Sequence, residues 1–364
     1  MSGVTPQDER WLDAAVRIAT PWLGTTAENP TVGALVVDEL RQVLIGRGVT
    51  ARGGRPHAEP QALQEAGGKA RGRTLYVTLE PCNHWGRTPP CADAVVRAGV
   101  ARVVIGVVDP DPRTAGRGIR RMEEAGVEVA VANHAPSRRL HEGFLLRHQL
   151  RRPFITAKLA VSADGKIGLR NQPKVPVSGA LAQRWTHMQR AQSDAVMVGA
   201  STAGIDDPRL DVRLPGLEDR VHLRVVLVGA RPFDPRIELI DSVSPFSTAV
   251  IVPEGRALDV PKTVEVIEVP PRNGRPELGA AMRALAARGI SRLLVEGGAV
   301  LTEALLADDL VDRFHLISSE RKLGPAGIDA TILGGMDGRI RAAGLTEVDQ
   351  RRLGEDNVRT FERL

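Results

Sequence analysis

The segment between residues 57 and 91 decides the fold and the chemistry of the first half of this chain. It begins with His57-Ala58-Glu59 and ends with Pro81-Cys82-Asn83-His84-Trp85-Gly86-Arg87-Thr88-Pro89-Pro90-Cys91. Zinc prefers imidazole nitrogen and thiolate sulfur, and a catalytic zinc site uses three protein ligands so that a fourth position can hold water. His57, Cys82 and Cys91 are such a set, so the segment predicts a hydrolytic zinc centre.

Glu59 lies two residues after the histidine and supplies the proton chemistry that such a centre needs. We expect it to act as a general base beside the metal-activated water, and then as a proton donor to the substrate's ring nitrogen and the departing ammonia. The spacing also places Glu59 in the first turn of an expected helix, where the helix dipole would help to keep its carboxylate ionised.

The same residues also allow other interpretations. A lone histidine is more often an ordinary core or surface residue, and Cys82 and Cys91 are compatible with inert buried thiols or with half of a structural zinc site. A structural site needs four ligands, however, and this chain has only two cysteines in 364 residues, both inside one motif. The scarcity of cysteine therefore favours the catalytic interpretation.

The spacing of the two cysteines indicates a particular group of enzymes. The order His-x-Glu, then Pro-Cys, then a second cysteine matches the signature of zinc-dependent nucleobase deaminases. That signature has two residues between the cysteines, whereas eight, Asn83 to Pro90, separate them here. The longer loop resembles that of the pyrimidine deaminases of riboflavin biosynthesis, in which it is the expected form.

Length and charge limit the classes of protein to consider. A chain of 364 residues exceeds what one hydrophobic core usually serves, so we expect two domains, residues 1–150 and 151–364. Lys and Arg number 49 against 44 Asp and Glu, a net charge of +5 that suits an anionic small molecule but falls short of a nucleic-acid-binding surface. We expect no nucleic-acid partner.

The sequence shows no recognisable targeting segment or membrane span. Acidic residues interrupt the N-terminal region, and no window approaches the roughly 18 uninterrupted apolar residues that a span requires. We therefore expect a cytoplasmic protein without a membrane partner, in a compartment where thiols stay reduced and can hold metal.

Hydrophobic periodicity predicts an α/β fold in both halves. In the first half we expect helices at residues 7–23, 57–66, 91–98 and 137–152, and strands at 31–38, 43–48, 74–79, 103–108 and 127–132. In the second half we expect strands at 154–161, 194–199, 223–228, 248–252 and 292–296, and helices at 180–191, 277–288 and 300–307. Ser137 is expected to cap its helix, and the Pro- and Gly-rich residues 253–276 are expected to form surface loops.

Three smaller features have both a functional and an ordinary interpretation. Asn29 precedes Pro30, so its amide could bind a pyrimidine edge or the pair could simply open a turn. His84 and Trp85 could close over a bound ring or be ordinary loop residues. Gly297-Gly298 follows an expected strand and could hold a phosphate at a helix start, but it is not the dinucleotide fingerprint and is more often a tight turn.

A resemblance to the bifunctional riboflavin biosynthesis deaminase-reductases covers nearly the whole chain. Besides the deaminase motif, it rests on Lys158-Leu159-Ala160-Val161-Ser162-Ala163-Asp164-Gly165, Arg190-Ala191-Gln192-Ser193, Asp206-Asp207-Pro208-Arg209-Leu210 with Arg213, and Val295-Glu296-Gly297-Gly298. It implies a cytidine-deaminase-like three-layer first domain and a second domain similar to dihydrofolate reductase that uses NADPH. It also implies deamination of 2,5-diamino-6-(5-phosphoribosylamino)pyrimidin-4-one, followed by reduction of the ribosyl chain to ribityl.

The resemblance also assigns residues. It makes Ala160, Thr202, Asp206 and Gly298 contacts for NADPH, and Arg190, Leu210, Arg213 and Glu296 contacts for the substrate, with Lys158 beside the sugar and Asn29 beside the pyrimidine. Which of Lys158, Asp206 and Glu296 donates a proton during reduction stays open. The chain departs from many relatives just before Ser178, where they have a tryptophan near the cofactor and this chain has Pro176, with Lys174 two residues earlier, so neither position is assigned a role.

Two alternatives remain beside the bifunctional enzyme. One is a deaminase with a degenerate reductase domain, which Pro176 suggests. The other is a non-catalytic regulator that binds metal and nucleotide, against which Glu59 counts because such a protein would not need it. By analogy with similar reductase domains, we expect a homodimer or a larger homo-oligomer.

Overall fold

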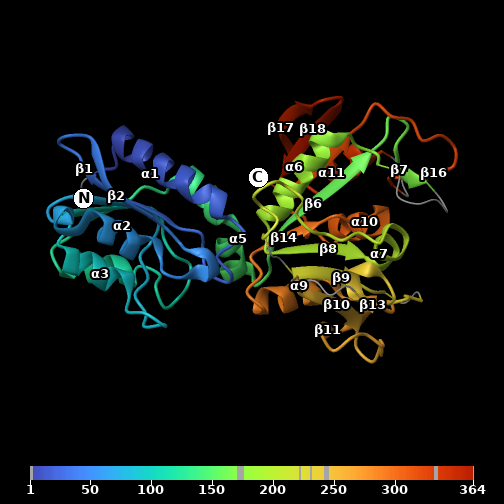
Figure 1. The fold of residues 1–364 in the computed structure, drawn as a ribbon, viewed down its shortest axis with the longest axis horizontal. Coiled ribbons are helices and arrows are strands. Elements are labelled where there is room, and N and C mark those ends of the chain that lie inside the picture. Colours follow the sequence, from blue (N-terminus) through green and yellow to red (C-terminus); the bar gives the residue numbers. More distant parts are fainter. Residues whose placement is uncertain are drawn as a thin grey trace. The chain divides into compact units, whose positions relative to one another are not determined.

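The computed structural model describes residues 3–169, 176–220, 223–229, 232–241, 246–331 and 335–363. The chain divides into two compact units, Met1–Arg151 and Arg152–Leu364 (Figure 1). Within the described ranges, no helix combines the length and apolar character needed to cross a membrane.

The first unit is built around a five-stranded sheet with the order β2-β1-β3-β4-β5. Its strands are β1 (Gly33–Asp38), β2 (Val43–Val49), β3 (Thr74–Leu79), β4 (Arg102–Val107) and β5 (Glu128–Val131). Its helices are α1 (Pro6–Ala19), α2 (Ala58–Ala66), α3 (Cys91–Ala98), α4 (Arg117–Glu124) and α5 (Ala135–Leu150). β3, β4 and β5 run parallel, whereas β1 is antiparallel to both of its neighbours.

Helices cover both faces of this sheet, which gives three layers (Figure 1). α2, α3 and α4 share one apolar cluster with the strands, and α1 packs against the opposite face through Leu12 and Ala15. On β2, a Cβ at Gly46 would lie 2.2 Å from the carbonyl oxygen of Ala62, and one at Gly48 would lie 2.0 Å from that of Ala58. These glycines let α2 approach the sheet closely, and α2 follows directly after His57.

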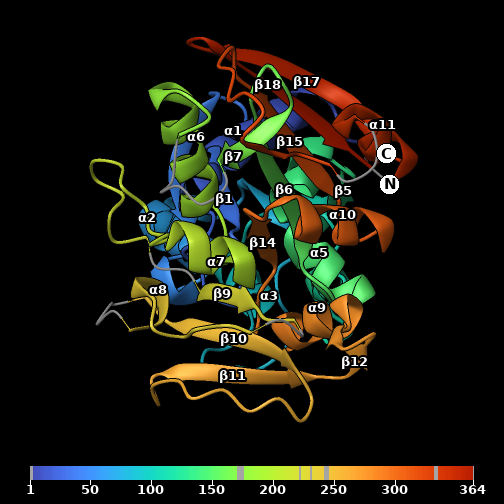
Figure 2. The same cartoon turned by 90° about the vertical axis from the view of Figure 1, so that its right-hand side faces the viewer.

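The second unit is built around a nine-stranded sheet with the order β11-β10-β9-β8-β14-β6-β15-β18-β17 (Figure 2). Its strands are β6 (Phe154–Val161), β8 (Ala195–Gly199), β9 (Leu223–Leu227), β10 (Thr248–Pro253), β11 (Val264–Val269), β14 (Arg292–Val295), β15 (Arg313–Ser318), β17 (Thr346–Leu353) and β18 (Asp356–Glu362). The first seven in spatial order run parallel to their neighbours, and the β17–β18 hairpin adds antiparallel strands at β15.

Helices and two small ribbons surround this sheet. The helices are α6 (Ala180–Ala191), α7 (Ala200–Asp206), α8 (Glu238–Asp241), α9 (Leu278–Ala287), α10 (Ala299–Ala307) and α11 (Met336–Ala342). The ribbons pair β7 (Lys166–Leu169) with β16 (Gly327–Asp329), and β12 (Pro271–Arg272) with β13 (Arg275–Pro276). The carboxyl ends of the neighbouring strands β8, β14 and β6 meet at one edge of the sheet, where ligands of parallel α/β sheets bind.

The structure confirms most of the predicted elements and corrects three points. Residues 253–276 are not only surface loops, because β11 lies there as an edge strand with Val264, Ile267 and Val269 buried. The first helix ends at Ala19 rather than residue 23, since Pro21 has no backbone N–H and a 3-10 turn follows. Ser137 is not a helix cap, because α5 already begins at Ala135.

Asp8 joins three elements of the first unit through buried hydrogen bonds. Its carboxylate accepts bonds from Arg102 at 2.7 and 3.1 Å and from the Tyr76 hydroxyl at 2.9 Å, which ties α1 to β4 and β3. Burial raises the pKa of Asp8, but the bonds from Arg102, Thr5 and Tyr76 outweigh it and lower the pKa from 3.8 to about 2.

We expect Asp8→Asn to lower the unfolding free energy of this unit by about 2 kcal/mol near neutral pH, since the carboxylate favours the folded state. Because the folded pKa is depressed, this contribution is complete above the unfolded pKa and disappears as the pH falls towards 2. The difference between the two proteins should therefore shrink in acid. Hydrogen exchange of the β3 and β4 amides at several pH values measures this difference in unfolding free energy. Asp234→Asn, in an exposed pair with Arg236, is the control and should change stability little.

Candidate active sites

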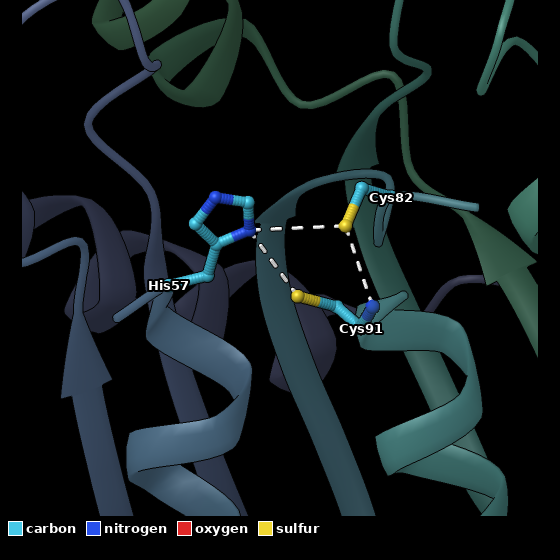
Figure 3. A group of neighbouring side chains, drawn as sticks. All are labelled: His57, Cys82 and Cys91. Carbon is cyan, nitrogen blue, oxygen red and sulfur yellow. Dashed lines mark hydrogen bonds between the residues drawn. The ribbon is translucent and has the colours of Figure 1, made fainter. Parts of the chain in front are cut away.

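Three separate elements bring the predicted metal ligands together. His57 is the residue before α2, Cys82 follows the end of β3, and Cys91 is the first residue of α3. Figure 3 shows the histidine ring and the two sulfur atoms turned towards one another. The structure thus places residues that are 34 positions apart in sequence at one edge of the first sheet.

The spacing of the three ligand atoms suits a zinc ion. Nδ1 of His57 lies 3.3 Å from Sγ of Cys91 and 3.8 Å from Sγ of Cys82, and all three atoms lie within 4.8 Å of one another. A tetrahedral zinc ion separates such ligand atoms by roughly 3.6 Å, since Zn–N is about 2.1 Å and Zn–S about 2.3 Å. The two cysteines are free thiols rather than a disulfide, so both sulfurs can bind metal.

The surroundings of Cys82 favour its thiolate form. The Cys91 thiol donates to the Cys82 sulfur, and the Cys91 backbone N–H donates to it at 3.3 Å; with His57 nearby, these bonds lower the pKa of Cys82 to about 4 despite burial. The shared proton and burial raise the pKa of Cys91 above its usual value. One thiolate is therefore ready for a metal, and the metal would take the place of the proton of the second.

Glu59 lies in the first turn of α2, as predicted, and its side chain is buried. Complete burial raises its pKa to about 7, although His57 opposes the shift. Desolvation outweighs the helix dipole here because the side chain has almost no contact with solvent. A carboxyl group with a pKa near 7 can accept a proton and return it at neutral pH, which suits an acid-base role.

Glu80, which no sequence motif indicates, holds the loop after β4 in place. Its buried carboxylate accepts hydrogen bonds from four backbone N–H groups, those of Asp109 (3.2 Å), Gly116 (3.0 Å), Gly118 (3.0 Å) and Ile119 (3.2 Å). These bonds hold the segment after β4 beside the end of β3, which leads to Cys82. Nothing in the local sequence separates this glutamate from an ordinary strand end, because all its partners lie far along the chain.

The loops near the metal ligands hold the other predicted residues of this site. Asn29 lies beside the loop that leads to His57, since a Cβ at Gly54 would lie 2.2 Å from the Asn29 Nδ2 atom. In the loop between the cysteines, His84 Nδ1 lies 3.3 Å from the Thr114 hydroxyl, and Trp85 is exposed.

In the second unit, Gly298 and Thr202 lie close together after the ends of two neighbouring strands. Gly199 ends β8 and precedes α7, whereas Gly298 follows the neighbouring strand β14 and precedes α10. A Cβ at Gly298 would lie 3.3 Å from the Thr202 hydroxyl, a tight contact that glycine avoids. Two helix starts at adjacent parallel strands suit the pyrophosphate of a dinucleotide such as NADPH. Asp206 ends α7.

The predicted residues of β6 lie on the face of the sheet that α6 covers. Lys158 and Ala160 are paired in register with His315 and Ile317 of β15. Ala160 packs in one apolar cluster with Trp185 of α6, whose ring meets His315 edge-on at 4.8 Å. Pro176 accepts a hydrogen bond from Arg321 through its carbonyl group. Lys174 lies outside the described residues.

The four predicted substrate contacts meet at the end of α6. Arg190 binds Glu296 with both arms of its guanidinium group, at 2.5 and 3.0 Å, and donates to the carbonyl oxygen of Asp211 at 2.8 Å. Leu210 is buried and has a left-handed backbone with φ of 52°, which is strained for a leucine. Arg213 follows this turn with its side chain half exposed.

Comparisons with known proteins match both units. The family described as "Cytidine and deoxycytidylate deaminase zinc-binding region" matches residues 5–107, and "RibD C-terminal domain" matches residues 153–357. The Escherichia coli (strain K12) protein named "Riboflavin biosynthesis protein RibD" is 33% identical over 362 residues, which cover 96% of this chain and 98% of that protein.

Two solved structures are similar over their full length. Acinetobacter baumannii RibD has a TM-score of 0.86 at 30% identity, with 98% of this chain and 99% of that chain covered. A diaminohydroxyphosphoribosylaminopyrimidine deaminase/5-amino-6-(5-phosphoribosylamino)uracil reductase from Thermotoga maritima has a TM-score of 0.83 at 28% identity, with the same coverage. The predicted fold class, a cytidine-deaminase-like domain followed by a dihydrofolate-reductase-like domain, is thereby confirmed.

We expect the purified protein to hold about one zinc ion per chain, and Cys82→Ala to lose it, because only two ligands remain. The affinity should fall by more than the roughly 10- to 100-fold that follows loss of an outer hydrogen-bond partner. Metal analysis and competition with a chelator measure both. His84→Ala is the matched control, since His84 lies in the same loop but outside the ligand set. Equal zinc content in all three proteins would contradict the site.

Proposed function

Since this chain belongs to the RibD family of riboflavin biosynthesis proteins, we propose that residues 1–150 form its deaminase domain and residues 151–364 its reductase domain. The protein is a bifunctional enzyme, a zinc-dependent hydrolase that deaminates and an NADPH-dependent oxidoreductase that reduces. It acts on a small phosphorylated substrate. The names of its relatives support 2,5-diamino-6-(5-phosphoribosylamino)pyrimidin-4-one as that substrate, with reduction of the ribosyl chain to ribityl as the second step.

The convergence of one imidazole nitrogen and two sulfurs beside a buried carboxyl group is the observation that carries the deaminase assignment. His57, Cys82 and Cys91 would hold the zinc ion. When bound, zinc lowers the pKa of water from about 15.7 towards 7 and so provides a nucleophile at neutral pH. Asn29 would orient the pyrimidine from the loop beside His57.

Glu59 moves the protons of this reaction. With a pKa of about 7, its carboxylate takes one proton from the attacking water and passes it to the ring nitrogen, and then takes the second proton of that water and passes it to the amine, which leaves as ammonia. Because the side chain is buried, its proton exchanges with the substrate rather than with bulk water. One residue thus serves as base and acid in turn.

The second unit binds and orients both reactants of the reduction. When bound, NADPH supplies the hydride that reduces the ribosyl carbon. Gly298 and Thr202 would hold its phosphates, while Ala160 and Asp206 would line its path along the strand ends. The Arg190–Glu296 ion pair, the strained turn at Leu210, and Arg213 would position the sugar phosphate, with Lys158 near the sugar. Lys158, Asp206 and Glu296 remain the candidates for the proton donor.

We further propose a cytoplasmic, homo-oligomeric enzyme. Two free cysteines in a metal-binding arrangement support a reducing compartment. The edge strand β11 has an unpaired outer side within the described residues, and such an edge can pair with a second copy. Size-exclusion chromatography with light scattering tests the oligomeric state.

We expect Glu59→Gln to reduce deamination by roughly a hundredfold to ten-thousandfold, because the amide cannot move protons. Its zinc content and its reduction of the deaminated substrate should equal those of the unaltered protein. An ammonia-release assay and NADPH oxidation measure the two activities separately. Glu65→Gln, a change of an exposed carboxylate on the same helix, is the matched control. Normal ammonia release by the Glu59 variant would refute the assigned role.

We expect Gly298→Val to weaken NADPH binding by about tenfold or more, because its side chain occupies the space that a phosphate needs between helix starts. Gly204→Ala, in α7 with open space around it, should bind normally. Fluorescence titration with NADPH measures both. Absence of saturable binding by the unaltered protein would instead favour a deaminase with a degenerate reductase domain.

A further inference from the structure

The segment from Arg209 to Leu214 alternates between charged and apolar side chains. Leu210, Val212 and Leu214 are buried in apolar clusters. Arg209 and Arg213 are 60% and 53% exposed, whereas the side chain of Asp211 between them is only 8% exposed. The segment therefore presents two arginines at the surface of the second unit around a nearly buried carboxylate.

The Asp211 carboxylate holds both guanidinium groups. Arg209 Nη2 lies 3.1 Å from Oδ2 of Asp211, and Arg213 Nη1 contacts Oδ1 of the same carboxylate. Each guanidinium group thus binds Asp211 through one of its terminal nitrogens. The carboxylate thus holds two cations close together and balances one of their two positive charges.

Helix α6 fixes the backbone of this segment. Arg190 donates to the carbonyl oxygen of Asp211 at 2.8 Å, and the His187 ring lies 3.1 Å from that oxygen and 3.2 Å from the backbone nitrogen of Arg213. The left-handed turn at Leu210 lies within the same stretch. The two arginines therefore project from a backbone that several contacts hold in place.

The charges around the pair leave an excess of positive charge. Arg190 is neutralised by its two bonds to Glu296, and Asp211 balances only one of the two exposed arginines. Glu238 lies 3.8 Å from Arg209 and is a second carboxylate beside the two exposed arginines, so the excess comes from a third guanidinium group, that of the buried Arg224. Burial lowers the pKa of the nearby Arg224; Asp211 opposes this shift and Arg209 adds to it.

We propose that Arg209 is a second contact for the 5′-phosphate of the reductase substrate, beside Arg213, and that Asp211 is the positioning residue for both. The proposal rests on the proposed function, which assigns Arg213 to the substrate. A phosphate monoester carries nearly two negative charges at neutral pH and has three terminal oxygens. One guanidinium fork satisfies two of these oxygens, and a second fork alongside satisfies the third and balances the second charge.

The test compares the deaminated substrate with its dephosphorylated form in the reductase reaction. We expect Arg209→Ala to raise KM for the phosphorylated form by roughly 10- to 100-fold, the usual effect of losing a hydrogen bond between charged groups. The kcat should change little, and KM for the dephosphorylated form should stay the same. The Ki of inorganic phosphate as a competitive inhibitor should rise in parallel. Arg209→Lys should recover part of the loss, because charge remains without the fork.

The chain offers a matched control and a test of positioning. Arg351 on β17 forms the same Asp-x-Arg pair with Asp349 and is 52% exposed, so Arg351→Ala should behave like the unaltered protein. Asp211→Asn should reduce the preference for the phosphorylated form while the dephosphorylated form reacts as before. A merely structural role of Asp211 would instead slow both substrates equally.

Two results would overturn the proposal. One is an Arg209→Ala protein with the same KM and phosphate Ki as the Arg351→Ala protein. The other is an equal loss on both substrates, with NADPH titration confirming that the variant binds cofactor normally. If the unaltered protein reduced both forms with the same KM, the proposed substrate itself would be wrong, and the role of Arg209 would fall with it.

Discussion

The first half of the molecule depends on the meeting of three ligand atoms at one edge of a sheet. The histidine nitrogen and the two sulfurs come from a loop before α2, the end of β3 and the start of α3, and they lie within 4.8 Å of one another. Such a meeting requires α2 to lie directly on β2, which the two strand glycines allow. The packing of α2 on this sheet thus determines whether His57, Cys82 and Cys91 can bind one metal ion.

Buried carboxyl groups act differently in the two units because their partners differ. Burial raises the pKa of Glu59 to about 7, and it also raises the pKa of Glu80. Glu80 accepts four backbone N–H groups and serves to hold a loop. Asp211 is paired with arginines and organises cations. All three groups are buried but have different partners, which are the metal-ligand cluster for Glu59, backbone N–H groups for Glu80 and arginines for Asp211.

The second unit follows the general rule for parallel sheets. Gly298 and the Arg190–Glu296 pair lie at or beside the ends of β8, β14 and β6, which are neighbours in the sheet. Arg190 and Glu296 are 106 residues apart along the chain. The ion pair takes up most of the hydrogen-bonding capacity of Arg190. This leaves the exposed arginines of the 209–213 segment as the groups available to an anion.

The sequence by itself predicted the cluster of His57, Cys82 and Cys91, the place of Glu59 in the first turn of α2 and the α/β class, because each depends on residue types at short spacings or on regular periodicity. It was insufficient for β17, whose residues are mostly exposed and which is held by backbone pairing to β18. It also missed β11, hidden among prolines and glycines. Only the tertiary structure decided the loop contacts of Glu80, the raised pKa of Glu59 and the shared carboxylate of Arg209 and Arg213. The first two depend on burial and on atoms distant in sequence, and the third depends on the direction in which neighbouring side chains point, which the order of residues alone does not encode.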